Sequence, residues 1–386
     1  MAARTEAPKS YEAFAATIAA AAADGAPVRV TGAGSKAGWA VSPAEPAVEL
    51  STSKLDSIVE HNEGDLTAIV QAGVPLARLQ EQLAAAGQML ALDPPLGSAG
   101  EATIGGVFAT ADSGPLRHRY GGPRDLVLGM TVALSDGTLA RSGGKVIKNV
   151  AGYDLAKLFT GSHGTLGAIL EVAVRLHPLP AAAVTAAGES DDPAPLARAA
   201  GELAHAALEA QCLDVSWSAG RGRVLARFTG AQAAAQAGDA LRLLDGAGLA
   251  TEAVEDDAEL WDGQRRRQRS GGGLVLRVSG VQTQLEAQLR AAARVGSALV
   301  GRAAFGLSWM ALDGVSDDDA VAAVERLRRE LAPSPCVVLD APAGVRERVD
   351  VWGVDGGGPA VELMRRVKAR FDPTNACGPG AFVGGI

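Results

Sequence analysis

The sequence predicts an α+β fold with two domains. Helix-like and strand-like segments follow one another irregularly in the first half, unlike a regular βαβ repeat. In the second half, long helical segments alternate with pairs of strands, which is typical of a ferredoxin-like sheet covered on one face. A chain of 386 residues is also longer than one ordinary core requires. We expect one domain at 1–180, a second at 181–360, and a segment at 361–386 that returns to the first.

Composition and charge narrow the class of protein. Hydrophobic residues make up 47% of the chain and charged residues 21%, a normal globular balance. The net charge of −8 argues against a nucleic-acid partner. The cysteines Cys212, Cys336 and Cys377 lie far apart, which argues against a local zinc or iron–sulfur site and favours a reducing compartment. The apolar run at 13–23 falls short of the roughly 20 residues that a membrane span needs. We therefore expect a cytoplasmic protein that is attached to a membrane only through partners.

The N-terminal part begins with a helix and a glycine loop. Alanine predominates in Tyr11–Ala23, which predicts a helix, and Val28–Thr31 reads as a strand. The following loop contains G-x-G-x-x-A at Gly32, Gly34 and Ala37, but residues 38–43 are unsuited to the helix that a Rossmann site needs. Two interpretations remain for this loop. It is either a nest of backbone N–H groups that binds phosphate or a glycine-rich connection between strands.

Glycines are concentrated between residues 93 and 180. They occur in three motifs, ATIGG (102–106), GGKVIKNVAGYD (143–154) and GSHGTLGAILE (161–171). Clustered glycines between apolar runs are expected where backbone must approach a large ligand closely. Thr103 is a good N-cap for a helix over the next residues, and we expect free N–H groups of its first turn to face an anion.

Further elements follow from periodicity and turn residues. Helical spacing of Leu76, Leu79 and Leu83 follows Pro75, after a strand at 66–71. We also expect a hairpin, a short helix and a strand within the glycine-rich stretch, at 124–134 with 139–141, 155–159 and 166–176.

Three segments, in their order along the chain, resemble those of a known family. PVRVTGAGSK, ATIGGVFAT and GGKVIKNVAGYDLAKLFTGSHGTLGAILEV resemble the FAD-binding domain of the vanillyl-alcohol oxidase/PCMH superfamily. KNVAGYD followed by GS-x-GTLG is similar to its D-2-hydroxyacid dehydrogenase branch, and most of all to FAD-binding subunits of bacterial glycolate oxidases. The resemblance covers about residues 11–180 by motif and the rest by length and layout.

The resemblance implies a two-subdomain PCMH-type FAD-binding domain and a ferredoxin-like cap domain. It also implies that the first glycine loop holds the pyrophosphate through backbone N–H groups and that the later motifs lie along the cofactor. The residues carried over as FAD-binding are Thr31, Gly32, Ala33, Gly34, Ser35, Thr103, Gly105, Gly106, Thr110, Ser113, Gly114, Gly164, Gly167 and Ile169.

The chain departs from the family pattern at several positions. Val107 and Ala111 replace two asparagines of ATIGGN-x-A-T-N-A-G-G, and Asp112-Ser-Gly stands at its end. Family members that tether FAD covalently use a histidine in the first loop, and none occurs between Thr31 and Trp39, so we expect non-covalent FAD. In the C-terminal D-P-x-x-x-x-N-P-G-K/R signature, Gly378 and Ala381 replace the asparagine and the basic residue.

The second half carries the elements of the predicted cap domain. The expected helices and strands are 197–208, 231–244, 285–295 and 320–331, and 214–217, 223–229, 274–279 and 307–312. A tail helix is expected at 361–370.

No catalytic residue follows from the sequence. Catalytic relatives carry an H-x-x-x-x-x-H metal cluster in the cap, whereas this chain has only His205 there, so no metal site is expected. The run Arg265-Arg-Arg-x-Arg269 is either a substrate-carboxylate site or a solvated charge run. Residues proposed to border the flavin are His118, Lys148, Asn149 and Tyr153, and for Tyr153 and Lys157 a structural role on a short helix is an equal alternative.

The resemblance implies a function within a complex. It points to the FAD-binding subunit of a glycolate oxidase-type complex that oxidises 2-hydroxy acids to 2-oxo acids. The implied partners are a larger catalytic flavoprotein subunit and an iron–sulfur subunit. Two alternatives stay open: a self-sufficient FAD-dependent D-2-hydroxyacid dehydrogenase of the D-lactate type, and a structural subunit that has lost FAD.

Overall fold

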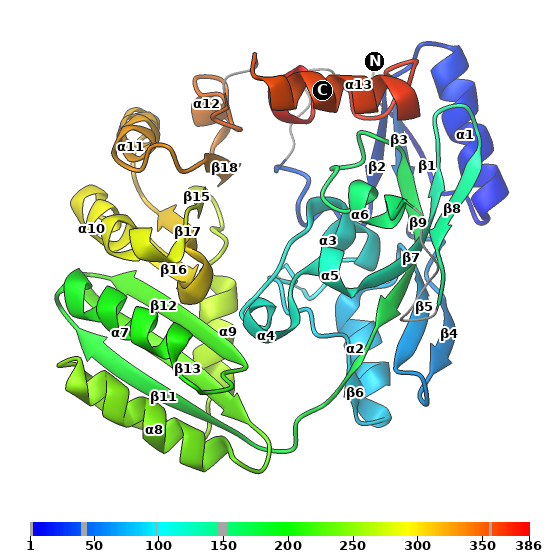
Figure 1. Cartoon of the computed structure of the whole chain (residues 1–386). Helices are drawn as coiled ribbons and strands as arrows, with labels where there is room; N and C mark the ends of the chain where they lie inside the picture. The colour runs from blue at the N-terminus through cyan, green and yellow to red at the C-terminus, as the bar shows by residue number, and fades with distance from the viewer. Residues whose placement is uncertain (1–2, 40–44, 98, 146–152, 355–356) are drawn as a thin grey trace. The chain divides into compact units, whose positions relative to one another are not determined.

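The computed structural model describes residues 3–39, 45–97, 99–145, 153–354 and 357–386 (Figure 1). These residues form two compact units. The first unit contains Met1–Ser113, Tyr120–Leu179 and Asp355–Ile386, and the second contains Gly114–Arg119 and Pro180–Val354. The chain therefore leaves the first unit twice, once for a six-residue segment, and returns to it at its C-terminus.

The first unit contains three sheets with helices packed on them. In chain order, its elements are β1 (Arg4–Glu6), α1 (Tyr11–Ala23), β2 (Val28–Thr31), β3 (Val48–Ser51), β4 (Ile58–Asn62), β5 (Thr67–Gln71), α2 (Leu76–Ala85), β6 (Gln88–Met89), α3 (Ile104–Thr110), α5 (Pro123–Leu126), β7 (Val127–Ala133), β8 (Leu139–Gly143), α6 (Leu155–Phe159), β9 (Ala168–Arg175), β10 (His177–Pro178) and α13 (Pro359–Phe371), followed by a 3-10 turn at Val383–Gly385.

The two larger sheets of this unit share a core with α1. β1, β3 and β2 form a parallel sheet, and β4, β5, β9, β7 and β8 form an antiparallel one in that order. α1 is alanine-rich and begins after Ser10, whose hydroxyl oxygen accepts a hydrogen bond from the Ala13 N–H at 3.1 Å. Phe14 and Ile18 of α1 are fully buried against residues of β2, β3, β7 and β9. This core fixes the strand ends from which the glycine loops start.

Tyr11 at the start of α1 is bonded to the antiparallel sheet. Its hydroxyl donates to Glu171 Oε2 at 2.8 Å and accepts from Gln71 Nε2 at 3.2 Å, while Thr131 donates to the other oxygen of Glu171 at 3.0 Å. Burial and the adjacent Glu171 carboxylate raise the pKa of Tyr11 to about 12, against an opposing hydrogen bond from Gln71. The neutral phenol thus joins α1 directly to β9 and β5, and through Glu171 to β7.

Replacing Tyr11 with phenylalanine is expected to destabilise the protein by about 1–2 kcal/mol at pH 7, because Glu171 loses a donor in a half-buried position. Since the folded-state pKa is raised from 10.0 to about 12, the stability from this group is complete below pH 10 and is lost as the pH rises through that interval. Urea unfolding at pH 7 and at pH 11 measures both effects. Tyr153→Phe is the matched control, because that side chain is 96% exposed. Equal midpoints for the wild type and Tyr11→Phe would contradict the expectation.

The second unit is built on one large sheet. Its elements are α4 (Arg117–Tyr120, which runs across the unit boundary), β11 (Ala183–Ser190), α7 (Pro193–His205), β12 (Cys212–Ser218), β13 (Arg221–Thr229), α8 (Ala233–Gly246), β14 (Ala250–Val254), α9 (Ala258–Arg266), β15 (Leu274–Ser279), α10 (Leu285–Val295), β16 (Ala298–Arg302), β17 (Leu307–Leu312), α11 (Asp317–Glu330), β18 (Cys336–Asp340) and α12 (Ala343–Arg346), with 3-10 turns at Gln282–Gln284 and Ala303–Phe305.

This sheet consists of two ferredoxin-like halves. The order of its eight strands is β14-β11-β13-β12-β16-β17-β15-β18, and all neighbours are antiparallel. Each half has the βαββαβ sequence, with its fourth strand beside its first and its third beside its second. The predicted ferredoxin-like sheet is therefore confirmed, and it occurs twice in tandem. Helices α7, α8, α10 and α11 bury their apolar sides in one continuous core on the same face (Figure 1).

The two halves meet between β12 and β16. There Asp214 and Arg302 are directly opposite each other, form an ion pair and are both 0% exposed. Gln264 of α9 donates to the same Asp214 oxygen at 3.1 Å, and the guanidinium carbon of Arg302 lies 5.0 Å from the centre of the Trp309 ring. A buried charge pair at one register position disfavours any shifted pairing of the two strands, because a shift would leave both charges unpaired.

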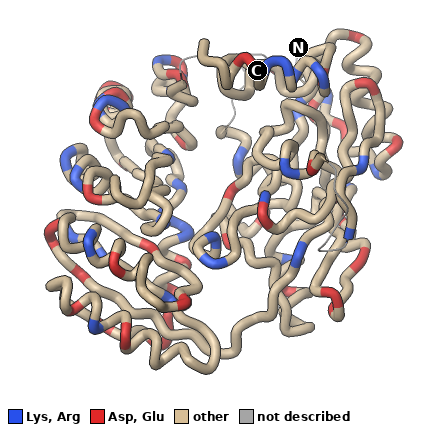
Figure 2. Tube along the Cα trace, in the orientation of Figure 1, with Lys and Arg blue, Asp and Glu red and all other residues tan. Residues whose placement is uncertain are grey.

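Surface charge is mixed in both units. Figure 2 shows basic and acidic residues interspersed along the traced chain. This distribution differs from the one-sided basic surface of nucleic-acid-binding proteins. Among the described residues, none of the helices has both the length and the apolar character needed to cross a membrane.

Candidate cofactor-binding site

The loop after β2 and two of the glycine motifs, ATIGG and GSHGTLGAILE, line a cavity of about 950 Å³, counting the part open to solvent. Four segments form its walls: β2 with the loop after it, α3 with its N-cap, the loop between α6 and β9, and the C-terminal segment. A smaller cavity of about 400 Å³ shares several of these residues and continues toward β9.

Most residues predicted to bind FAD line these cavities. Those lining the larger cavity are Thr31, Gly32, Ala33, Gly34, Ser35, Thr103, Gly106, Thr110 and Gly164. Gly105, Gly167 and Ile169 line the smaller one. Ser113 and Gly114 line neither: Ser113 is buried with its N–H bonded to Asp112 Oδ1 at 3.0 Å, and Gly114 begins the short segment that belongs to the second unit.

The loop after β2 offers backbone N–H groups to the larger cavity. In the described part of the chain, no hydrogen bond engages the N–H groups of Ala33, Gly34 or Ser35. Gly34 has a φ of +75°, and a Cβ there would meet no atom within 4 Å. None of the other described residues therefore covers the backbone at this turn. Successive free N–H groups around a left-handed residue form a nest that binds anions such as a pyrophosphate. This donor set fits the phosphate interpretation of the loop.

Gly32 packs against the next motif. A Cβ on Gly32 would lie 2.1 Å from the hydroxyl oxygen of Thr103, closer than any real contact. That same oxygen accepts the N–H of Gly106 at 3.3 Å and so caps α3, as the sequence predicts. The glycine at position 32 therefore lets the first loop touch the cap of α3.

The expectation that the first turn of α3 presents free N–H groups is wrong. The Ile104 N–H is bonded to the carbonyl of Val74 at 2.9 Å, and the Gly105 N–H to that of Ala72 at 2.8 Å. A Cβ on Gly105 would lie 2.7 Å from the Ala72 Cβ, so this glycine allows close packing on the loop after β5. The protein itself satisfies these donors, and α3 contributes a wall rather than an anion site.

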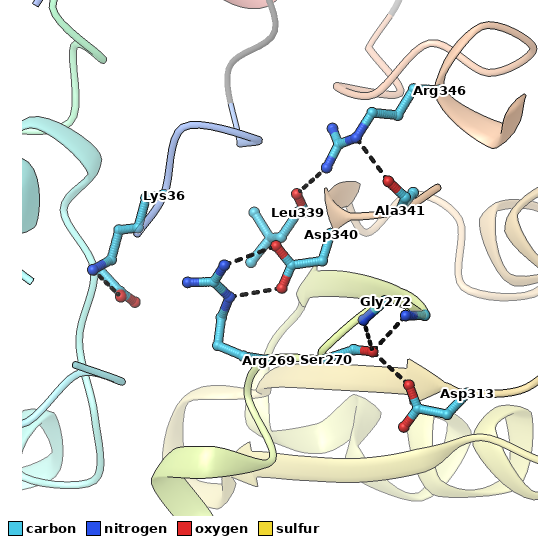
Figure 3. A network of polar contacts seen from close by, with 11 residues as sticks. Lys36, Arg269, Ser270, Gly272, Asp313, Leu339, Asp340, Ala341 and Arg346 are labelled. Carbon is cyan, nitrogen blue, oxygen red and sulfur yellow. Dashed lines mark hydrogen bonds and ion pairs between the residues drawn. The ribbon is translucent and has the colours of Figure 1, made fainter. Parts of the chain in front are cut away.

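A buried ion pair lies at the end of the first loop. Lys36 lines the larger cavity, is 9% exposed, and has its Nζ 3.4 Å from Asp112 Oδ2 (Figure 3). Its ammonium also lies 5.8 Å from the centre of the Trp39 ring. The pair connects the loop after β2 (Gly32–Lys36, called the phosphate loop below after its phosphate interpretation) with Asp112, two residues beyond the end of α3. Since each partner balances the charge of the other, both can remain ionised in a site that excludes most water.

His163 was not among the residues predicted for the site. It lies between the first two glycines of GSHGTLG, has a φ of 54°, and lines both cavities. Its ring lies 5.7 Å from that of Phe382. The sequence signal that could have identified His163 is its position as a large polar residue among the glycines of a cofactor motif.

Of the other residues proposed to border the flavin, His118 and Tyr153 line neither cavity. Lys148 and Asn149 lie outside the described residues. Tyr153 is 96% exposed, and Lys157 pairs with Asp154 at 3.2 Å on the surface. His118 lies on α4, in the segment that belongs to the second unit, where burial lowers the pKa of its imidazole.

Three of the four arginines after Trp261 pair with carboxylates of this chain. Arg265 pairs with Asp262, and Arg266 with Glu259. Figure 3 shows the two-pronged pairing of Arg269 with Asp340, at 2.6 and 3.0 Å. Each of these three guanidinium groups already has a carboxylate partner, which favours a structural role for them.

Comparison with known proteins agrees with the motifs. Residues 2–143 match the family described as FAD binding domain. The chain is 41% identical over 128 residues to glycolate oxidase subunit GlcE of Escherichia coli (strain K12), which covers 33% of this chain and 36% of that protein. It is 39% identical over 155 residues to glycolate oxidase subunit GlcD of Bacillus subtilis (strain 168), covering 40% and 32%.

A further curated relative matches part of the chain, and a solved structure matches nearly all of its fold. D-lactate dehydrogenase [cytochrome] 1, mitochondrial, of Saccharomyces cerevisiae (strain ATCC 204508 / S288c) is 34% identical over 161 residues, which is 42% of this chain and 27% of that protein. The matches to these curated relatives thus span about a third of their length or less. A solved structure of alkyldihydroxyacetonephosphate synthase superposes with a TM-score of 0.71 over 97% of this chain and 76% of that one, at 15% identity, a likeness of fold alone.

The fold and the cavity fit a large, phosphate-containing cofactor. The match over residues 2–143 and the relatives identify the cofactor: the chain contains an FAD-binding domain of the PCMH type, and its cofactor is FAD. The glycine-lined cavity and the free N–H groups of the first loop fit this cofactor.

Proposed function

We propose that the protein is the FAD-binding subunit of a glycolate oxidase-type complex that oxidises 2-hydroxy acids to 2-oxo acids. The observation that carries this proposal is the meeting of the loop after β2 with the ATIGG and GSHGTLGAILE motifs at one cavity, in a chain whose FAD-binding region is 41% identical to a glycolate oxidase subunit. FAD, when bound, supplies a two-electron acceptor. Oxidation of the substrate removes two electrons and two protons, and the electrons pass on to an iron–sulfur partner.

The residues of the first unit position the cofactor. The N–H groups of Ala33, Gly34 and Ser35 hold its pyrophosphate, and Thr103, Gly106 and Gly164 leave room for its length. Family members that bind FAD covalently attach it to a histidine of the first loop, and this loop has no histidine between Thr31 and Trp39. We therefore propose that FAD is held non-covalently.

The proposed division of labour places substrate turnover mainly in a larger flavoprotein partner. His205, the only histidine of 181–360, uses its ring to bond the Gly201 carbonyl at 2.8 Å on its own helix, a structural role. Three of the four arginines of the run, Arg265, Arg266 and Arg269, are paired within the chain. These side chains support a subunit whose own FAD transfers electrons or stabilises the complex.

A second candidate is a self-sufficient D-2-hydroxyacid dehydrogenase, which the similarity to a D-lactate dehydrogenase favours. Anaerobic mixing of the FAD-loaded chain with glycolate or D-lactate distinguishes the two. Bleaching of the flavin only after the co-purified partner subunits are added supports the subunit proposal. Rapid bleaching in the isolated chain supports the second candidate, and a chain that cannot be loaded with FAD would indicate a purely structural subunit.

A further inference from the structure

The C-terminal segment extends the parallel sheet of the first unit. The Val28 N–H donates to the carbonyl of Ala376 at 2.7 Å, and the Gly378 N–H donates to that of Val28 at 2.9 Å. These bonds add residues 376–378 beside β2, at the strand that leads into the phosphate loop. Gly378, Pro379 and Ala381 then line the larger cavity. The last residues of the chain are therefore part of the cavity wall.

One buried lysine holds this segment in place. Lys368 of α13 is 6% exposed, and its Nζ donates to the carbonyls of Thr165 and Cys377, both at 2.7 Å, and to Asp372 Oδ2 at 2.6 Å. An ammonium has three N–H donors, so all of them are used. Thr165 belongs to the loop that supplies His163 and Gly164 to the cavity. A single side chain thus connects two walls of the site.

Asp372 completes the connection from the same helix end. Its Oδ2 also accepts the Cys377 N–H at 2.8 Å, and its Oδ1 accepts the Ala376 N–H at 3.1 Å. Burial works to raise the pKa of this carboxyl, but the hydrogen bond and charge of Lys368, with the Cys377 N–H, outweigh burial and hold it below its usual value. The charge therefore persists at neutral pH, and residues 376–377 are fixed from both sides.

The far end of the segment has its own contacts. The Phe382 ring packs 5.7 Å from His163, and Arg365 of α13 donates to the Gly384 carbonyl at 3.0 Å. Both contacts lie beyond the residues that Lys368 and Asp372 hold. The segment is thus anchored before and after the part that faces the cavity.

We propose that residues 376–386 form a clasp that retains FAD, and that Lys368 is the positioning residue that keeps this clasp closed. The inference rests on the proposal that the larger cavity holds FAD. Loosening the clasp removes one wall of the cavity and frees the loop carrying Thr165, so FAD leaves faster while the phosphate loop itself is unchanged.

The test compares FAD dissociation from the full-length protein and three variants. Lys368→Met combined with Asp372→Asn removes both charges, which avoids leaving one buried charge unpaired. A chain ending at Pro379 removes Ala381 and Phe382 but keeps every bond of Lys368. Arg370→Met is the matched control, because Arg370 is an exposed cation on the same turn of α13. We expect at least a tenfold faster release of FAD from the first two and less than twofold change in the control.

Hydrogen exchange reports on the C-terminal segment itself, separately from the overall stability of the protein. The amide hydrogens of Cys377 and Gly378 are expected to exchange faster in the double variant, and FAD is expected to slow their exchange in the wild type. If the wild type binds FAD and both test variants release it at the wild-type rate, the clasp is refuted while the proposed FAD site stands. If the wild type cannot bind FAD, both proposals fail. If the double variant does not fold, the rate of FAD release from the chain ending at Pro379 tests the clasp on its own.

Discussion

Replacing Gly32 with alanine is expected to lower the affinity for FAD by at least tenfold, or about 1.4 kcal/mol. The new Cβ would lie 2.1 Å from the Thr103 hydroxyl oxygen, so the Thr103 side chain has to move. Its bond to the Gly106 N–H is then lost, and the phosphate loop is pushed away from α3. Titration of the FAD-free protein with FAD, followed by the change in flavin fluorescence, measures the loss.

The control for this substitution is Gly25→Ala. Gly25 lies before β2, on the other side of that strand from Gly32, and has a φ of +66°, but a Cβ there meets no atom within 4 Å. We expect this variant to lose about 1 kcal/mol of stability through backbone strain and to keep its affinity for FAD. The double variant Gly32→Ala with Thr103→Ala should recover part of the affinity, because the clashing hydroxyl is gone. Unchanged FAD binding in Gly32→Ala would mean that the contact with Thr103 does not shape the site.

Arg302→Met is expected to destabilise the second unit by about 3–5 kcal/mol, because it leaves the carboxylate of Asp214 buried without its cation. Both side chains are 0% exposed, so water cannot replace the lost partner. The substitution also removes the charge that fixes the pairing of β12 with β16, where the two ferredoxin-like halves join. Urea unfolding followed by circular dichroism measures the effect.

Two further variants separate the charge from the packing in this test. Asp214→Asn combined with Arg302→Met removes both charges and keeps an acceptor for Gln264, so we expect most of the stability to return. Arg290→Met removes a half-exposed arginine that pairs with Glu286 at 2.8 Å, and a much smaller loss of stability is expected. An Arg302→Met variant as stable as the Arg290→Met variant would contradict a role for the buried pair.

Local sequence patterns predicted many elements with their observed bounds. The helices α1, α6 and α10 and the strands β2, β15 and β17 begin and end where periodicity and turn residues place them. Several strands were missed, among them β18 with its apolar run CVVLD, and two of the missed strands have weak local signals. β11 is the alanine-rich and glycine-containing AVTAAGES, and β14 is a largely exposed edge strand. Their pairing partners are distant in sequence, so the duplication of the ferredoxin-like unit was not visible either.

The candidate site was predictable as far as backbone motifs define it. Glycine clusters indicated which segments approach the cofactor, and nearly all of the named residues line the cavities. The error over the free N–H groups of α3 arose because their acceptors, Ala72 and Val74, come from a loop about thirty residues earlier. The role of Lys368 was hidden for the same reason, since Thr165 is 203 residues away along the chain.

The central claim is that the cavity between the glycine motifs holds FAD without a covalent bond. Titration of the purified protein with FAD, with the visible spectrum recorded before and after the polypeptide is precipitated, tests it most directly. We predict saturable, stoichiometric binding and complete recovery of free FAD in the supernatant, with affinity lowered by Gly32→Ala and unchanged by Gly25→Ala. A protein that stays colourless at saturating FAD, or a flavin that stays with the precipitated chain, would contradict the account.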